Sequence, residues 1–205
     1  MRTHSSPLLS AEDDRHRRTL CRSPAVSSAQ LRTGLARRQF IPFFQPVVTV
    51  QTGALHGLEA TVRWAHPRLG LLAPSDFLCE ADQYGLLDSL VAQWMAAVRE
   101  AAAGWRVSGL SVGVSLHLSG AMLRTQTVHG NFAEVLEWEP PRTWRTGVDT
   151  VLDWYRLLES GAELAQGDFV CAPQPAAALP SALHVWRARF QAANATRFLP
   201  FPCFF

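Results

Sequence analysis

Apolar positions after residue 30 fall into short runs that are typical of strands. Residues 40–50 form an apolar and β-branched run that ends at the turn residues Thr52 and Gly53. Residues 55–64 predict a second strand, and the alternation over residues 110–118 predicts a third. The prolines and the glycine between residues 67 and 74 indicate an irregular loop after the second strand.

A helix is predicted between the second and third strands. Leu87, Val91, Trp94 and Val98 recur at three- and four-residue steps, which places them on one helix face, and Gly104 is expected to end the helix. The remaining expected elements are a short helix from residue 30, a short strand at residues 147–148, a helix that ends near Ser160 and is capped by Asp149 or Thr150, and a last strand at residues 166–171.

Strands that alternate with helices indicate the α/β class and a largely parallel sheet. In such folds the ligand site lies at the carboxyl ends of the strands. We expect one folded domain at residues 30–190, a flexible leader rich in Ser, Arg and Pro at residues 1–29, and an irregular tail ending in FLPFPCFF at residues 191–205.

Composition excludes several classes of function. The net charge of +2 is too small for a nucleic-acid-binding surface. All 19 basic residues are arginine. No uninterrupted apolar stretch is long enough to span a membrane, and the N-terminus lacks the apolar region of a secretory signal. The sequence therefore predicts a cytoplasmic protein with no nucleic acid and no membrane among its partners.

The first two predicted strands carry an ordered set of motifs. The first reads FIPFFQPVV, and the second continues as GLEATVRWAHPRLGLLAPSDF. Together they resemble the opening of EAL domains, in which a Gln-Pro ends the first strand and a Glu-Ala-Leu-x-Arg-Trp signature lies on the second. The matching residues are Gln45, Pro46, Glu59, Ala60, Arg63, Trp64, His66, Pro67, Gly70, Pro74 and Phe77. Thr61 stands where the family has the leucine of its signature.

Two later segments also resemble this family, with substitutions. In VGVSLHLSGAML, His117 occupies the position of a metal-binding Asn. In the segment that begins GVDTVLDWY, Thr146 replaces a leading Glu and Asp149 a second one, whereas Gln166 and Gly167 match the Gln-Gly element of the family.

The resemblance implies a TIM-barrel-like fold and hydrolysis of cyclic di-GMP with two Mg²⁺ or Mn²⁺ ions that activate a water. Of the metal ligands, Glu59 is the one certain carboxylate that is retained, and His117 offers a nitrogen that suits softer ions. The central family segment, with another Glu, an Asp-Asp pair and a Lys, has no counterpart between His117 and Thr146. The barrel is therefore expected to lack several central βα units.

The candidate ligand-binding residues implied by the resemblance are Gln45, Arg63, Pro74 and Gln166, and the candidate metal ligands are Glu59 and His117. Each also has a structural interpretation. Glu59 would line a polar pocket as a relic, the glutamines would satisfy loop backbone groups, and His117 would be a hydrogen-bonded strand histidine. No catalytic residue is assigned, because Thr146 stands where the family has a Glu.

Three functions remain open. The chain is a cyclic di-GMP binding or adaptor module without activity, a nonfunctional remnant, or an active metal-dependent cyclic di-GMP phosphodiesterase. The lost ligands favour the first two interpretations over the enzyme. Because an incomplete barrel exposes strand edges and apolar faces, a protein partner or a second copy of the chain is also expected.

Overall fold

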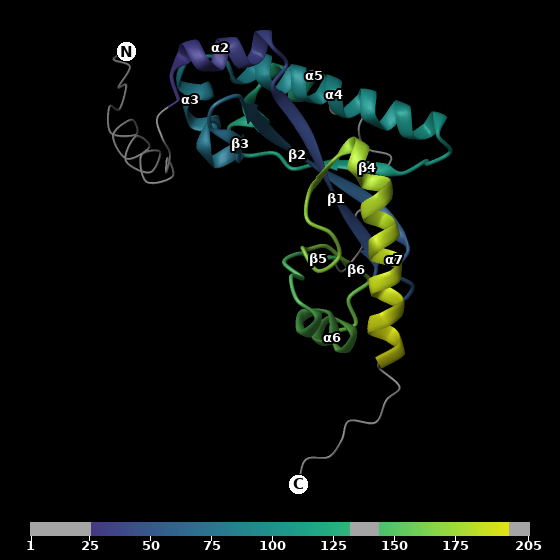
Figure 1. The fold of residues 1–205 in the computed structure, drawn as a ribbon. Helices are drawn as coiled ribbons and strands as arrows, with labels where there is room; N and C mark the ends of the chain where they lie inside the picture. Colours follow the sequence, from purple (N-terminus) through teal and green to yellow (C-terminus); the bar gives the residue numbers. More distant parts are fainter. Residues whose placement is uncertain (1–25, 132–143, 197–205) are drawn as a thin grey trace, which may run out of the picture.

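A computed structural model describes residues 26–131 and 144–196. It contains a curled, mixed sheet with helices around it (Figure 1). The helices are α2 (Ser28–Ala36), α3 (Leu78–Gln83), α4 (Leu87–Val107), α5 (Gln126–Asn131), α6 (Val151–Glu159) and α7 (Leu179–Thr196). The strands are β1 (Phe40–Thr49), β2 (Leu55–His66), β3 (Gly70–Leu72), β4 (Gly113–Leu116), β5 (Trp144–Arg145), β6 (Leu164–Ala165) and β7 (Gln174–Pro175).

The sheet is mixed, so the expectation of a largely parallel sheet was wrong. The strand order is β3-β2-β1-β6-β5, with β4 paired to β2 and β7 to β1. Strand β1 runs antiparallel to β2, β6 and β7, whereas β2–β4 and β5–β6 are parallel pairs. The turn at Thr52 and Gly53 is too short to carry a crossover, so β1 and β2 form a hairpin.

The β1–β2 pairing separates a core face from a polar face. On the core face Phe44 lies opposite Ala60, and Phe40 lies opposite Trp64; all four side chains are buried. Because alternate residues of a strand point to opposite sides, Gln45 and its partner Glu59 lie on the other face. This register sets which side of the hairpin is available to a ligand.

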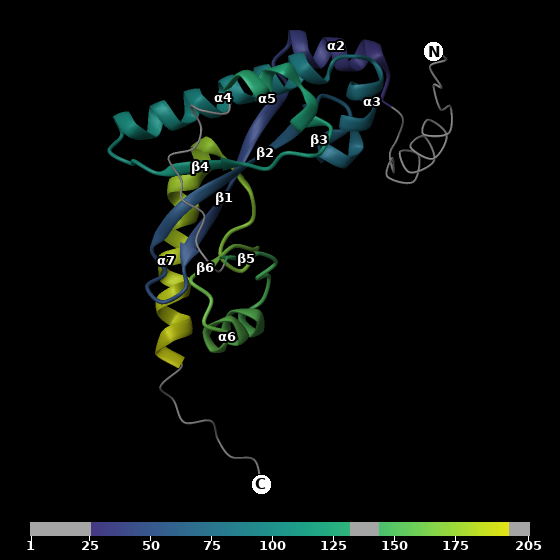
Figure 2. The ribbon, with the colours of Figure 1, turned by 180° about the vertical axis from the view of Figure 1, so that it is seen from behind.

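Two apolar clusters hold the helices against the sheet. The first, with Trp64, Phe77 and Trp94 among its members, packs α2, α3 and α4 on the core face of β1 and β2 (Figure 1). The second contains Trp154 and Trp186, whose rings meet edge to face with centroids 5.2 Å apart, and joins α6 to α7. Seen from behind, α7 runs beside the lower part of β1 and α4 crosses above it (Figure 2).

Helix starts follow the capping rules. Ser27 and Gln30 form a reciprocal capping box, so α2 begins two residues before the predicted residue 30. Thr150, one of the two expected caps, accepts from Asp153 N at 3.2 Å and begins α6. None of the helices in the described ranges is long and apolar enough to cross a membrane.

Several predicted boundaries were wrong. Helix α4 continues past Gly104 to Val107, because an isolated helical glycine weakens a helix without ending it. The short strand expected at residues 147–148 lies instead at Trp144–Arg145, and residues 166–171 form a turn after β6 rather than a strand. Residues 1–25 and 197–205, where most of the expected leader and part of the tail fall, lie outside the described residues.

The turn after β6 depends on Gly167. A Cβ at this position would lie 2.2 Å from Val148 O and 2.3 Å from Val148 N, and this backbone is held by hydrogen bonds to Gln166 and Phe169. We expect Gly167→Ala to lower the free energy of unfolding by about 2 kcal/mol or more, because neither backbone atom can move freely. Urea denaturation measures the change.

Gly104→Ala is the matched control for Gly167→Ala. A Cβ at Gly104 would meet no atom within 4 Å, and the residue lies inside α4. Alanine there should raise the free energy of unfolding by about 0.5–1 kcal/mol, since glycine is the less favourable residue in a helix. Equal stabilities of the two variants would contradict the close approach at Gly167.

Candidate functional site

The polar face of the hairpin borders a cavity of about 390 Å³. Five of the sequence-predicted site residues line it, namely Gln45, Glu59, Arg63, Pro74 and His117. Gln45 lies on β1, and Glu59 and Arg63 lie on β2. Pro74 lies in the short 3-10 turn after β3, and His117 directly follows β4. The structure thus brings together residues that are up to 72 positions apart in the sequence.

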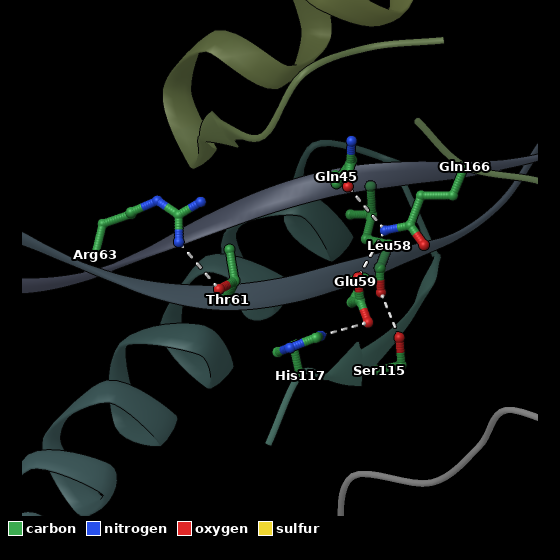
Figure 3. A network of polar contacts seen from close by, with 8 residues as sticks. All are labelled: Gln45, Leu58, Glu59, Thr61, Arg63, Ser115, His117 and Gln166. Carbon is green, nitrogen blue, oxygen red and sulfur yellow. Dashed lines mark hydrogen bonds and ion pairs between the residues drawn. The ribbon is translucent and has the colours of Figure 1, made fainter. Parts of the chain in front are cut away.

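Glu59 is the centre of the polar contacts (Figure 3). Gln166 Nε2 donates to Glu59 Oε2 at 2.7 Å and to Gln45 Oε1 at 3.0 Å. His117 Nδ1 lies 3.3 Å from Glu59 Oε1. Gln45 Nε2 in turn donates to Cys171 O at 3.1 Å and to Asp168 Oδ1 at 3.4 Å. Side chains from β1, β2, the residue after β4 and the turn after β6 therefore form one network.

Gln166 links the C-terminal part of the chain to the hairpin. Its side chain is 2% exposed, and its Oε1 has no hydrogen-bond donor among the described residues. The amide orientation follows from the carboxylate, because exchanging the two amide atoms would place Oε1 against Glu59 Oε2. The Gln166 side chain thus supports two lining residues, although it is absent from the cavity lining itself. It bonds side chains rather than the loop backbone groups expected of it, whereas Gln45 does donate to a backbone carbonyl, that of Cys171.

Arg63 lies at the far end of the cavity from this network (Figure 3). Its Nη1 donates to Thr61 Oγ1 at 3.3 Å and to Val62 O at 3.2 Å. Partial burial lowers the pKa of Arg63 from its ordinary value, and the Asp76 carboxylate acts in the opposite direction. A guanidinium stays protonated at neutral pH even so, so the cavity keeps a permanent positive charge.

Thr146 is exposed and does not line the cavity. It directly follows Arg145, whose carbonyl accepts from Gln166 N at 2.9 Å, so it lies at the sheet edge next to the network. The sequence reasoning missed Thr61, Ser119 and Pro173 as cavity residues. Thr61 had been noted only for breaking the family signature, yet it holds the Arg63 side chain.

The donor set that the described residues offer at this cavity does not fit two hard divalent cations. The described ranges contain no group of three His, Cys, Asp or Glu side chains that could hold a metal ion. Mg²⁺ and Mn²⁺ prefer several oxygen ligands, whereas this cavity presents one carboxylate and one imidazole. Both oxygens of that carboxylate already contact protein donors.

Removal of the Gln166 amide tests the network. We expect Gln166→Ala to lower the free energy of unfolding by about 1–3 kcal/mol, because Glu59 and Gln45 lose their shared buried donor. Gln51→Ala, in the exposed β1–β2 turn, is the control and should change stability little. Equal urea midpoints for the two variants would contradict a structural role for Gln166.

Solved structures confirm the fold. The chain matches an EAL enzyme, Bd1971, in its form bound to cAMP and cyclic di-GMP, with a TM-score of 0.58, 12% identity, and coverage of 87% of this chain and 71% of that one. It also matches the FimX EAL domain of Xanthomonas citri in complex with cyclic di-GMP, with a TM-score of 0.54, 13% identity, and coverage of 80% and 96%. The predicted α/β, TIM-barrel-like EAL fold with missing central units agrees with these matches.

Sequence relatives agree with the structures. The cyclic di-GMP phosphodiesterase PdeR of Escherichia coli is 34% identical over 107 residues, which cover 52% of this chain and 16% of that protein. An uncharacterised signalling protein of Caulobacter vibrioides is 35% identical over 167 residues, or 76% of this chain and 19% of that one. The chain thus spans less than a fifth of the length of either relative. Because the model of the EAL domain matches residues 28–145, more than half of the sequence, the chain belongs to the EAL domain family.

Proposed function

We propose that this chain binds cyclic di-GMP without hydrolysing it and acts as a binding or adaptor module in cyclic di-GMP signalling. The observation that carries the proposal is the cavity itself, which keeps Arg63, Gln45 and Pro74 in one wall while the metal-ligand set is reduced. EAL domains of known structure have been solved with cyclic di-GMP bound, which supports the choice of ligand.

Arg63 supplies the charge for a phosphate. Among the described residues, Thr61 and Val62 use only Nη1 of its guanidinium, which leaves its other nitrogen donors for a ligand. A guanidinium binds phosphate oxygens through paired hydrogen bonds and needs no metal to do so. Its partial burial strengthens such a contact, because the surroundings are less polar than water.

The spacing of polar groups along β2 fits an extended ligand rather than a single phosphate. Glu59 and Arg63 are four residues apart on β2, which corresponds to about 13 Å along an extended strand. A single phosphate cannot contact both ends of this wall. A cyclic dinucleotide reaches both, with its polar groups near Gln45 and His117 at one end and a phosphate at Arg63 at the other.

Hydrolysis requires more than this site offers. Activation of a water by two metals needs ligands that hold both ions and lower the pKa of the water. Phosphodiesterases of this family depend in general on divalent metals. With Glu59 bound by Gln166 and Thr146 lacking a carboxylate, the described residues support binding better than bond cleavage.

A protein partner, or a second copy of the chain, would bind close to the bound nucleotide. Leu71 in the short edge strand β3 and Leu69 just before it are 51% and 45% exposed. Strand β3 pairs only with the end of β2 that follows Arg63, so a ligand at Arg63 lies close to this edge. An exposed apolar edge is a typical contact for another protein or a second copy of the chain.

Binding should depend on Arg63. We expect cyclic di-GMP to raise the thermal midpoint of the purified chain, because a ligand that binds only the folded state stabilises it by mass action. Arg63→Ala should weaken the affinity by about tenfold or more in calorimetry, from loss of a charge-assisted contact. Arg68→Ala, an exposed arginine outside the cavity, is the charge-matched control.

The outcomes separate the alternatives. No thermal shift and no calorimetric heat in the parent chain would contradict binding and favour a remnant. An equal loss of affinity in both arginine variants would indicate general electrostatic attraction rather than this cavity.

The absence of hydrolysis is tested separately. Incubated with cyclic di-GMP and Mn²⁺, the purified chain should release no more linear dinucleotide than its Glu59→Ala variant, as followed by chromatography. Turnover that is abolished by Glu59→Ala would overturn the proposal and establish the active phosphodiesterase.

A further inference from the structure

The contacts of Glu59 engage both oxygens of its carboxylate. Gln166 Nε2 lies 2.7 Å from Oε2, and His117 Nδ1 lies 3.3 Å from Oε1. An ionised carboxylate only accepts hydrogen bonds, so His117 must carry its hydrogen on Nδ1 for this contact to be attractive. The Nδ1 lone pair is then unavailable to a cation that would also bind Glu59.

These contacts give Glu59 a different task from that of a metal ligand. The carboxylate accepts from the buried amide of Gln166, which also donates to Gln45 at 3.0 Å. It thereby fixes the position of two glutamines and of the His117 ring. Its side chain is 22% exposed, compared with 66% for His117, so it lies beneath the imidazole rather than at the mouth of the cavity.

Positive charge for a phosphodiester then has to come from side chains. Arg63 provides a permanent cation at one end of the cavity wall. His117 provides an imidazole at the other end, where its Nδ1 lies 3.3 Å from Glu59 Oε1. Two further carboxylates lie near this wall among the described residues: Asp76 interacts electrostatically with Arg63, and Asp168 Oδ1 accepts from Gln45 Nε2 at 3.4 Å. Gln45 contributes only a neutral amide.

We propose that this cavity takes its phosphodiester ligand without a divalent cation, with Arg63 as its cationic group and Glu59 as a hydrogen-bond acceptor that positions Gln166 and His117. This inference rests on the proposed function, because it concerns the same cavity and the same ligand. It goes further by removing the metal from the binding step and assigning a new role to the carboxylate.

Calorimetry with and without metal tests the inference on the full chain. We expect the dissociation constant of cyclic di-GMP to agree within about twofold between a buffer with excess EDTA and one with excess Mg²⁺ or Mn²⁺. Binding that requires either metal, or that tightens by about tenfold or more when it is added, would overturn the inference while leaving the proposed function intact. No binding in any buffer would overturn both.

Glu59→Gln gives an independent readout. A glutamine keeps an oxygen that accepts from Gln166, and its amide N–H can donate to His117 Nδ1 when the ring carries its hydrogen on Nε2 instead, but it removes a negative charge near an anionic ligand. We therefore expect Glu59→Gln to tighten binding of cyclic di-GMP by about threefold or more, in EDTA and in Mg²⁺ alike.

The control for this variant is Glu100→Gln. It removes the same charge from an exposed position on α4 outside the cavity, and it should change the affinity less than Glu59→Gln does. If Glu59 instead held a metal that bridges to the ligand, Glu59→Gln would weaken binding in Mg²⁺. Weaker binding in the variant, with the far-ultraviolet circular dichroism spectrum unchanged, would overturn the inference.

Discussion

The antiparallel pairing of β1 with β2 is the constraint on which the rest of the structure depends. Its register places Gln45 opposite Glu59 on one face, and Phe44 opposite Ala60 on the other. A shift by one residue would exchange the two faces, because side chains alternate along a strand. Burial of Phe40, Phe44 and Trp64 makes any such shift unfavourable, so the apolar core also fixes the polar wall of the cavity.

The buried amide of Gln166 connects the C-terminal part of the chain to both polar residues of this wall. Gln166 bridges Gln45 and Glu59 from more than a hundred positions away, and Gly167 lets the turn pack against the backbone of Val148. The second apolar cluster, around Trp154 and Trp186, holds that turn in place from below. The cavity wall and the packing of α6 and α7 are therefore coupled. Loss of the second cluster would displace Gln166 and weaken its hydrogen bond to Glu59.

The cavity shows how a binding site can lose one chemistry and keep another. A metal centre requires several convergent oxygen ligands, so the loss of a few carboxylates removes it. Recognition of a phosphate through a guanidinium requires only one well-placed side chain with free donors. In this chain the Glu59 carboxylate, the one carboxylate in the cavity lining, accepts a hydrogen bond from Gln166, while Arg63 on β2 still lines the cavity.

Much of the site was predictable from motifs, because ordered residues such as Gln45, Glu59, Arg63 and Pro74 identify the family and, through it, a shared cavity. The periodic helix at residues 87–107 was also predictable, apart from its end. The shorter elements were not: β5 and β6 each span two residues, too few to show an alternating pattern.

The sequence by itself determined the family, the main strands and helix, and the reduced set of metal ligands, since these follow from residue types and local spacing. Only the tertiary structure decided that β1 runs antiparallel to its neighbours and that Thr61 accepts a hydrogen bond from Arg63. It also decided that Gln166 and His117 contact the two carboxylate oxygens of Glu59. These features depend on which distant segments meet, and that is set by burial of the whole apolar core rather than by any local pattern.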